Sequence, residues 1–265
     1  MIDQSVHAEL RARFNPDGSL LRRHQLRMLE MLKYIDAVCR ENDIPYWLSS
    51  GTCLGAVRHG GFIPWDDDVD IEMFREDYLR LEKILAIKND YYLQTHDTDP
   101  YYVAPYAKLR DRKSVISEFS QDLKYKYKGI YIDIFQLEAL PQWLSHLTER
   151  INWRILLLGS GSNKFTAPFF FILKKLFYIS VPVLRCSCRL FCDANTLRHT
   201  FGSGFYKRIR KREWMLPVSM VRFEDCQFPI PKDADSYLRS LYGDNYMTLP
   251  NLEKIHGHVT HIEIF

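Results

Sequence analysis

Four aspartates stand within five positions, at Asp66, Asp67, Asp68 and Asp70. Carboxylates packed this closely repel one another, and each one disfavours the ionised form of its neighbours. A chain keeps such a cluster either in contact with water or around a bound cation. Apolar residues flank the cluster on both sides, which argues against simple solvation. The pattern therefore favours a cation site, and an acidic surface loop is the alternative.

The alternation of polar and apolar residues indicates how these carboxylates are arranged. Asp68, Val69, Asp70 and Ile71 are typical of the start of a strand, in which successive side chains point to opposite faces. Asp68 and Asp70 would then share one face, about 7 Å apart. Two carboxylates at this spacing suit a hard divalent ion, because Mg²⁺ takes one or two protein carboxylates plus phosphate oxygens and water. The expected ion is Mg²⁺, with Mn²⁺ as the alternative.

The residues before the cluster are suited to phosphate. Gly51 and Thr52 stand where an expected strand over 46–49 gives way to a helical run over 54–58. Free backbone N–H groups at the start of a helix attract phosphate. Arg58 and His59, at the end of that run, are expected either to contact the donor or to have a structural role.

Two later segments carry charges on expected strands. Residues 129–135 are apolar except for Asp133 in the middle, and a buried carboxylate needs a partner because desolvating it alone is very costly. Lys108 and Arg110 share one face of the preceding strand with Tyr106. They are expected to neutralise phosphate oxygens. The alternatives are an ion-paired structural role for Asp133 and plain surface charges for the two cations.

One run of sequence makes the chain recognisable. The segment GTCLGAVRHGGFIPWDDDVDIEMFREDY, residues 51–78, resembles the hallmark of the LicD family, with Cys53 where Leu is usual. The Lys-Leu-Arg step at 108–110 and Asp-Ile-Phe at 133–135 also resemble the family, although Gln136 replaces its proline. A Tyr-Gly-Asp step at 242–244 is similar to the family's C-terminal segment. The resemblance thus covers both ends of the chain and skips the middle.

The resemblance implies a function. LicD proteins are phosphocholine or related phospho-group transferases and distant relatives of the DNA polymerase β-like nucleotidyltransferases. By this resemblance the chain would transfer phosphocholine from CDP-choline to a sugar hydroxyl of a lipopolysaccharide, teichoic acid or capsule. Asp68, Asp70 and Asp133 would hold the metal, and Asp133 could also accept the hydroxyl proton. The alternatives are another CDP-linked donor, such as ribitol or glycerol phosphate, and a non-catalytic membrane-associated scaffold.

The elements that position these residues can be outlined. Helical periodicity predicts helices over 20–42 and 75–87 and a third helix that ends at Gly243. The pattern of the other segments predicts strands over 91–94 and 101–109 and a β-hairpin within 221–231. The expected fold class is α/β (α+β), a nucleotidyltransferase-like mixed sheet flanked by helices. Residues 1–140 would form the catalytic core, 141–215 a helical insertion, and 216–265 a segment that completes the catalytic domain.

The insertion is unusually apolar. Residues 165–192 are rich in Phe, Leu and Ile, but Lys174, Lys175 and Pro182 interrupt the run and argue against a simple membrane span. An interfacial helix on a membrane surface, where a lipid-linked glycan acceptor would be found, is the expectation. Packing on the core or on a second subunit is the alternative. Cys186, Cys188 and Cys192 have no standard zinc spacing and are expected to pack as small apolar residues.

Composition indicates the class of protein and the compartment in which it is expected. The chain has 265 residues, of which 46% are hydrophobic, so it can bury a core, and its net charge of +3 is too small for a typical nucleic-acid binder. Six scattered cysteines and a polar start predict free thiols in the cytoplasm, with the protein peripheral on the cytoplasmic membrane face. Basic residues at 207–212 are expected on a solvated face. The last residues, with His256, His258 and His261, are expected to form a mobile polar tail, and metal binding by these histidines is the alternative.

Overall fold

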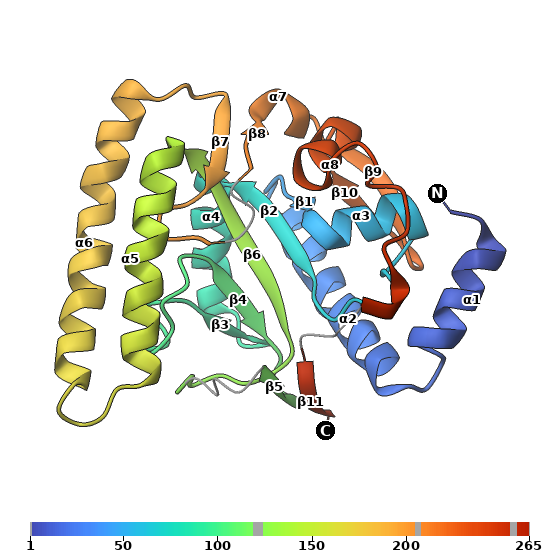
Figure 1. The fold of residues 1–265 in the computed structure, drawn as a ribbon, viewed down its shortest axis with the longest axis horizontal. Helices are drawn as coiled ribbons and strands as arrows, with labels where there is room; N and C mark the ends of the chain where they lie inside the picture. The colour runs from blue at the N-terminus through green and yellow to red at the C-terminus, as the bar shows by residue number, and fades with distance from the viewer. Residues whose placement is uncertain (1, 119–123, 205–207, 255–258, 265) are drawn as a thin grey trace.

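A mixed seven-stranded sheet forms the centre of the computed structural model, which describes residues 2–118, 124–204, 208–254 and 259–264. The core strands run in the spatial order β1 (Trp47–Leu48), β2 (Asp70–Phe74), β6 (Tyr131–Ala139), β4 (Ala107–Arg110) and β3 (Tyr92–Gln94). β2 and β6 are parallel, and the other pairs are antiparallel. The far half of β6 pairs with β7 (Thr196–His199), which in turn pairs with β8 (Arg210–Lys211) (Figure 1).

Two amphipathic helices cover one face of this sheet. α2 (Leu20–Glu41) and α4 (Arg75–Ile87) pack against β2 and β6, behind the sheet in Figure 1. Leu32 and Ile35 of α2 are fully buried with Ile71 of β2 and Ile134 of β6. The apolar side chains of these strands therefore face the helices, and the alternate side chains, including Asp70 and Asp133, face the other way.

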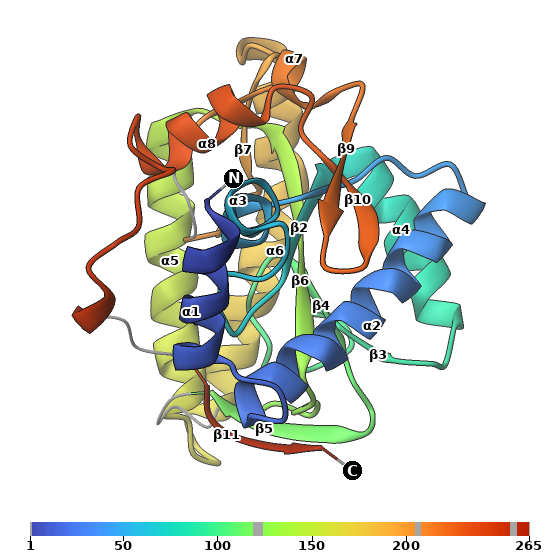
Figure 2. The ribbon, with the colours of Figure 1, turned by 90° about the vertical axis from the view of Figure 1, so that its right-hand side faces the viewer.

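The C-terminal part of the chain closes one side of the domain. Its elements are α7 (Arg212–Met215), the antiparallel hairpin of β9 (Ser219–Phe223) and β10 (Cys226–Ile230), α8 (Ala234–Tyr242) and the short 3₁₀ helix η1 (Leu252–Lys254). The hairpin and α8 pack near α3 (Ser50–His59), and α1 (Gln4–Phe14) lies outside α3 (Figure 2). Gly243 ends α8 with a positive φ of 84°, a conformation that glycine adopts without strain.

A helical hairpin projects from the other side. α5 (Gln142–Ser160) and α6 (Ala167–Phe191) pack side by side at the edge of the molecule (Figure 1). They have a hydrophobic cluster of their own, which includes Phe170, Phe177 and Phe201 and is separate from the main core. The helices approach closely at Gly159, where a Cβ atom would lie 2.6 Å from the Phe170 ring.

Most expected elements are confirmed, including the α/β (α+β) class, the two long helices, the 221–231 hairpin and the helix that ends at Gly243. Three expectations need correction. The strand expected over 101–109 starts only at Ala107, because Pro105 has no N–H to donate to a sheet. Within 141–215, β7 and β8 rejoin the central sheet after the helices. The expected polar tail instead contains β11 (Val259–Ile264), which pairs with β5 (Ser114–Glu118), while His256 and His258 lie outside the described residues.

Candidate active site

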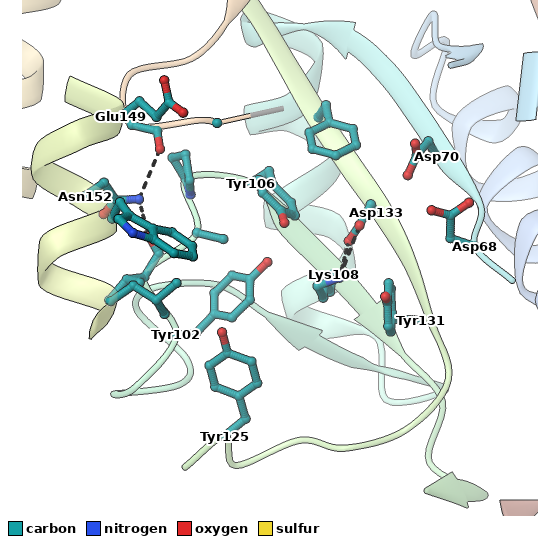
Figure 3. A pocket seen from close by; sticks show the side chains of 18 residues that line it. Asp68, Asp70, Tyr102, Tyr106, Lys108, Tyr125, Tyr131, Asp133, Glu149 and Asn152 are labelled. Atoms are coloured by element: carbon teal, nitrogen blue, oxygen red, sulfur yellow. Dashed lines mark hydrogen bonds and ion pairs between the residues drawn. The ribbon is translucent and has the colours of Figure 1, made fainter. Parts of the chain in front are cut away.

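The sheet brings the predicted acidic and basic residues together. In the parallel pairing of β2 with β6, Asp70 is the register partner of Asp133. In the antiparallel pairing of β6 with β4, Asp133 is the register partner of Lys108. Three neighbouring strands therefore present Asp70, Asp133 and Lys108 side by side on one face, and Asp68 lies at the entrance to β2 (Figure 3).

Lys108 is the cation of this group. Its Nζ lies 2.8 Å from Oδ1 and 3.1 Å from Oδ2 of Asp133. The same Nζ lies 3.3 Å from the centroid of the Tyr131 ring, a cation–π contact that a buried ammonium favours. Lys108 is 6% exposed and is therefore not a plain surface charge. Its ion pair with Asp133 is also what a structural role of Asp133 predicts, so the metal role of Asp133 stays a prediction.

The electrostatics of the cluster suit a bound cation. Burial raises the pKa of Asp70 well above its usual value, and the charges of Asp68 and Asp133 raise it further, against an opposing effect of Lys108. Burial and the carboxylates of Asp68 and Asp67 also raise the pKa of Asp66. Lys108 opposes these effects at Asp70 and Arg58 opposes them at Asp66, but both carboxyl pKa values stay raised, and a divalent ion would relieve the repulsion.

The arrangement is not a closed metal cage. Among the residues that the structure describes, no group of three or more His, Cys, Asp or Glu side chains is placed to hold a metal by itself. This fits Mg²⁺ better than a fully protein-bound ion, because Mg²⁺ keeps waters and substrate phosphates among its ligands. Asp68, Asp70 and Asp133 as Mg²⁺ or Mn²⁺ ligands stay a prediction.

The start of α3 supports β2 directly. The backbone N–H of Asp70 donates to the Thr52 hydroxyl over 2.9 Å, and the Ser49 N–H donates to the Asp70 carbonyl over 2.9 Å. The Asp66 carboxylate lies over Gly51, where a Cβ atom would be 3.0 Å from its Oδ2. Gly51 therefore leaves room for Asp66, and Thr52 fixes the strand that carries Asp70. Phosphate binding by these two residues stays a prediction.

Three predicted donor contacts are engaged elsewhere and do not line the cavity described below. Arg58 donates to the carbonyls of Tyr246 and Thr248, at 3.0 and 3.2 Å, and its Nε donates to His59. Arg110 is 1% exposed and donates to the Gln94 side chain. These contacts stabilise the structure around the site, and a role of Arg58, His59 or Arg110 in donor binding stays a prediction.

A cavity of about 720 Å³ opens on the acidic cluster. One end is lined by Asp68, Asp70, Asp133 and Lys108. The remainder of its wall is largely aromatic, with Glu149 and Asn152 of α5 on the far side (Figure 3). The aromatic lining residues are Tyr102, Tyr106, Tyr125, Tyr131, Phe135 and Trp153. We call these six residues the aromatic wall.

Most of the aromatic wall was not predicted from sequence. Tyr106 was placed correctly beside Lys108, because both follow the period of two. Tyr102 and Tyr125 come from irregular segments and Trp153 from α5, and no periodic pattern relates these three. The Tyr102 hydroxyl is buried and has no hydrogen-bond partner among the described residues, so it is available to a ligand.

The comparisons match the part of the chain that carries most of this cavity. Residues 43–153 match the family model described as "LicD/FKTN/FKRP, nucleotidyltransferase domain". This range contains every residue that lines the cavity except Leu156, Gly202 and Gly204.

Named relatives extend the match over most of the chain. The chain is 29% identical to the lipopolysaccharide cholinephosphotransferase LicD of Haemophilus influenzae, over 87% of this chain and 92% of that protein. It is 42% identical to human ribitol 5-phosphate transferase FKRP over 21% of this chain and 11% of that protein. It is 40% identical to human ribitol-5-phosphate transferase FKTN over 23% of this chain and 13% of that protein. Residues 43–153 are therefore similar to the LicD/FKTN/FKRP nucleotidyltransferase domain, and most of the chain is similar to a LicD cholinephosphotransferase.

Proposed function

We propose that this phosphotransferase moves phosphocholine from CDP-choline to a sugar hydroxyl of a cell-surface glycan, with Mg²⁺ as cofactor. The similarity to named cholinephosphate and ribitol-phosphate transferases supports phospho-group transfer as the reaction class. The observation that carries the finer proposal is that carboxylates, a lysine and the aromatic wall share one cavity.

The two ends of the cavity suit the two ends of phosphocholine. Lys108 is placed to bind phosphate oxygens by charge-assisted hydrogen bonds once it is released from Asp133. The Tyr106 ring centroid lies 5.8 Å from the Lys108 Nζ, and Tyr102 packs edge-on against Tyr106. Aromatic faces attract quaternary ammonium groups, so the wall would hold the choline head while Lys108 holds the phosphate.

The reaction is an in-line displacement at the phosphorus next to choline. The acceptor oxygen attacks, CMP departs, and the hydroxyl proton passes to a carboxylate of the cluster. A Mg²⁺ ion held by Asp68, Asp70 and Asp133 would neutralise charge on the pyrophosphate. Lys108 and the cavity walls orient the donor, which is the larger part of catalysis in phosphoryl transfer.

The test is CMP release from a panel of CDP-linked donors with a glycan acceptor mixture, with and without Mg²⁺. We expect release from CDP-choline, and loss of at least about 100-fold in Asp68→Asn, Asp70→Asn and EDTA, because a removed electrostatic contact costs on that order. Release from another CDP-linked donor alone would keep the mechanism and replace choline. No release and no Mg²⁺-dependent CDP binding would favour the scaffold alternative.

A second variant pair separates choline recognition from general donor binding. Tyr106→Leu is expected to raise KM for CDP-choline about 5- to 30-fold, because a desolvated cation–π contact is worth about 1–2 kcal/mol. Tyr106→Phe keeps the ring and should stay within about threefold of wild type. CDP-ribitol, which has no ammonium group, serves as the control donor. If Leu and Phe variants behave alike, Tyr106 does not bind the choline head.

A ribitol phosphate transferase is the second candidate. The observation that favours it is the match to the ribitol phosphate transferases FKRP and FKTN. A polyol carries no positive charge and needs hydrogen bonds, which the Tyr102 hydroxyl and Asn152 offer only in part because Asn152 already donates to two carbonyls. The donor panel above distinguishes the two.

A further inference from the structure

The outer face of α6 carries a row of exposed apolar side chains. Six residues at spacings of three, four or seven share this face, and each exposes between 55% and 74% of its surface. They are Phe169, Ile172, Leu176, Ile179, Val183 and Leu190. We call them the outer stripe. The opposite face of α6 buries Phe170, Phe177 and Val181 in the hairpin cluster. α6 therefore has apolar side chains on two faces, and the domain covers only one of them.

Hydrogen bonds from the inner face of α6 hold the helix along the side of the catalytic domain. Lys174 Nζ donates to the carbonyls of His96 and Pro100 over 2.7 and 2.8 Å, and the Tyr178 hydroxyl donates to the Val103 carbonyl over 2.9 Å. By length and composition α6 could cross a membrane. These bonds instead hold it along the side of the domain, at the edge of the molecule in Figure 1, where it could lie in the plane of a membrane surface.

The charged residues of the segment that carries the outer stripe are all basic. No Asp or Glu occurs between Arg150 and Cys192. The exposed basic residues of this segment are Arg150, Arg154, Lys164, Lys175 and Arg189. The other two basic residues, Lys174 and Arg185, are bonded within the protein. An apolar row bordered by basic side chains alone is complementary to anionic lipid, whose acyl chains and headgroups match both features.

A second copy of the chain fits this surface less well. The spacing of the outer stripe resembles the seam of a coiled coil, but such seams are flanked by residues of opposite charge on the two helices. Two copies joined here would bring only basic flanks together, which would repel. The apolar surface also continues beyond a narrow seam, since Phe165 and Phe191 at the ends of α6 and Trp143 of α5 are exposed.

We propose that the α5–α6 hairpin binds in the plane of an anionic membrane surface, with the outer stripe inserted at the boundary of the headgroups and acyl chains. α5 supplies Glu149, Asn152 and Trp153 to the catalytic cavity, so the same hairpin would hold the cavity beside the bilayer. The proposal does not depend on the identity of the donor. It predicts that the acceptor is more accessible when it is carried on lipid.

The test is flotation of the full chain with vesicles of phosphatidylcholine alone or mixed equally with phosphatidylglycerol. We expect binding to the mixed vesicles that weakens with added salt. Leu176→Gln with Ile179→Gln should lower the partition coefficient at least about tenfold, because each change removes an apolar side chain that would be buried in the membrane interface. Leu20→Gln with Ile87→Gln changes two exposed apolar residues away from the hairpin and is the matched control.

A second pair tests the charge. Lys175→Gln with Arg189→Gln should remove most of the preference for phosphatidylglycerol and reduce the salt dependence, since each basic residue near an anionic surface adds roughly a fivefold factor. All these positions lie outside the cavity, so CMP release with a soluble acceptor should stay at the wild-type rate, which also verifies folding.

Three outcomes would overturn the proposal. One is no binding to mixed vesicles by wild type. Another is equal loss of binding in the outer-stripe pair and in the control pair. The third is a stable dimer in sedimentation equilibrium that the outer-stripe pair dissociates, which would assign this face to a second copy. Failure of the donor panel would leave the vesicle result unaffected, so the two proposals fail independently.

Discussion

Asp70 has an unfavourable electrostatic position. It is 7% exposed, it lies beside Asp133 across the β2–β6 pairing, and Asp68 precedes it on the same strand face. Residues placed for function often reduce stability, because the protein keeps a charge where folding alone would remove it. The raised pKa of Asp70, which burial and these neighbours cause, is the sign of that cost.

Removing this charge should therefore stabilise the metal-free protein while it abolishes activity. Asp70→Asn is expected to increase the free energy of unfolding in EDTA by about 1 kcal/mol, since it relieves repulsion in a nearly isosteric change. The measurement is urea unfolding near neutral pH. Asp17→Asn, at a side chain that is 90% exposed, is the control and should have little effect. A large loss of stability in Asp70→Asn would contradict the argument.

His24 should make the fold sensitive to acid. Burial lowers its pKa from 6.5 to about 4, against the opposing charge of Asp67. The unfolded chain therefore binds more protons than the folded one between these values. The stability is fully present above about pH 6.5 and is lost as the pH falls toward 4. The expected loss from this group is about 2 kcal/mol at pH 5.

The measurement is the free energy of unfolding against pH in wild type and His24→Gln. The variant should show a shallower pH dependence, whatever its stability at neutral pH. His59, whose pKa burial and Arg58 lower to about 3, acts in the same direction and should leave part of the slope. An identical slope in both proteins would rule out His24 as a source of acid sensitivity.

At the scale of elements, a buried ion pair joins β2 to β8. Glu72 is fully buried, and its carboxylate lies 2.7 Å from an Arg210 Nη and 2.7 Å from the His199 Nε2. Burial alone would raise the pKa of Glu72, but Arg210 and the hydrogen bond with His199 outweigh it and lower the pKa. Tyr237 of α8 donates to Glu72 and also contacts Ser49 before α3. This network therefore connects β2, which carries Asp70, to β7, β8 and α8.

Removing one partner of the Glu72–Arg210 ion pair should lower the stability of the fold. Glu72→Gln is expected to lower the free energy of unfolding by about 3–5 kcal/mol, because it removes the carboxylate that pairs with the fully buried Arg210 guanidinium. Glu72→Gln combined with Arg210→Met should recover part of the loss, which a double-mutant cycle in urea would measure. Glu213→Gln, whose pair with Lys211 is exposed, is the control. Additive effects of the two changes would mean that the pair is not coupled.

At the scale of the whole molecule, the chain has two hydrophobic clusters of unequal size. The main cluster lies between the sheet and its helices, and the smaller one holds α5 and α6 to the domain. Phe177 of α6 packs against Gly202, where a Cβ atom would lie 2.9 Å from its ring. The hairpin should therefore open without unfolding of the central sheet.

Hydrogen exchange tests this difference. Phe177→Ala is expected to accelerate amide exchange in α6 by a factor of about 100 or more, because a buried Phe contributes about 3–5 kcal/mol. Exchange in β2 and β6 should stay close to wild type. Phe171→Ala, a neighbouring position on α6 that is 37% exposed, should have a smaller effect. Equal acceleration in α6 and β6 would show that the two clusters unfold together.

The sequence by itself determined the local features of this protein. The helices over 20–41 and 75–87, the β9–β10 hairpin and the shared face of Lys108 and Tyr106 all follow from periodic patterns within a few turns or residues. The aspartate cluster and the family resemblance lie in one continuous run, 51–78. These properties depend on neighbours in the chain, and so they can be predicted from it.

Only the tertiary structure decided which distant residues meet. The strand order places Asp133 between Asp70 and Lys108, and no local period specifies that order. Arg210 lies in a run expected on a solvated face, yet it is fully buried because β8 brings it to Glu72. The aromatic wall likewise combines two loops, the residue before β4, two residues of β6 and one residue of α5. Its physical cause is chain folding between segments far apart in sequence, where burial and charge pairing depend on partners that a local pattern does not contain.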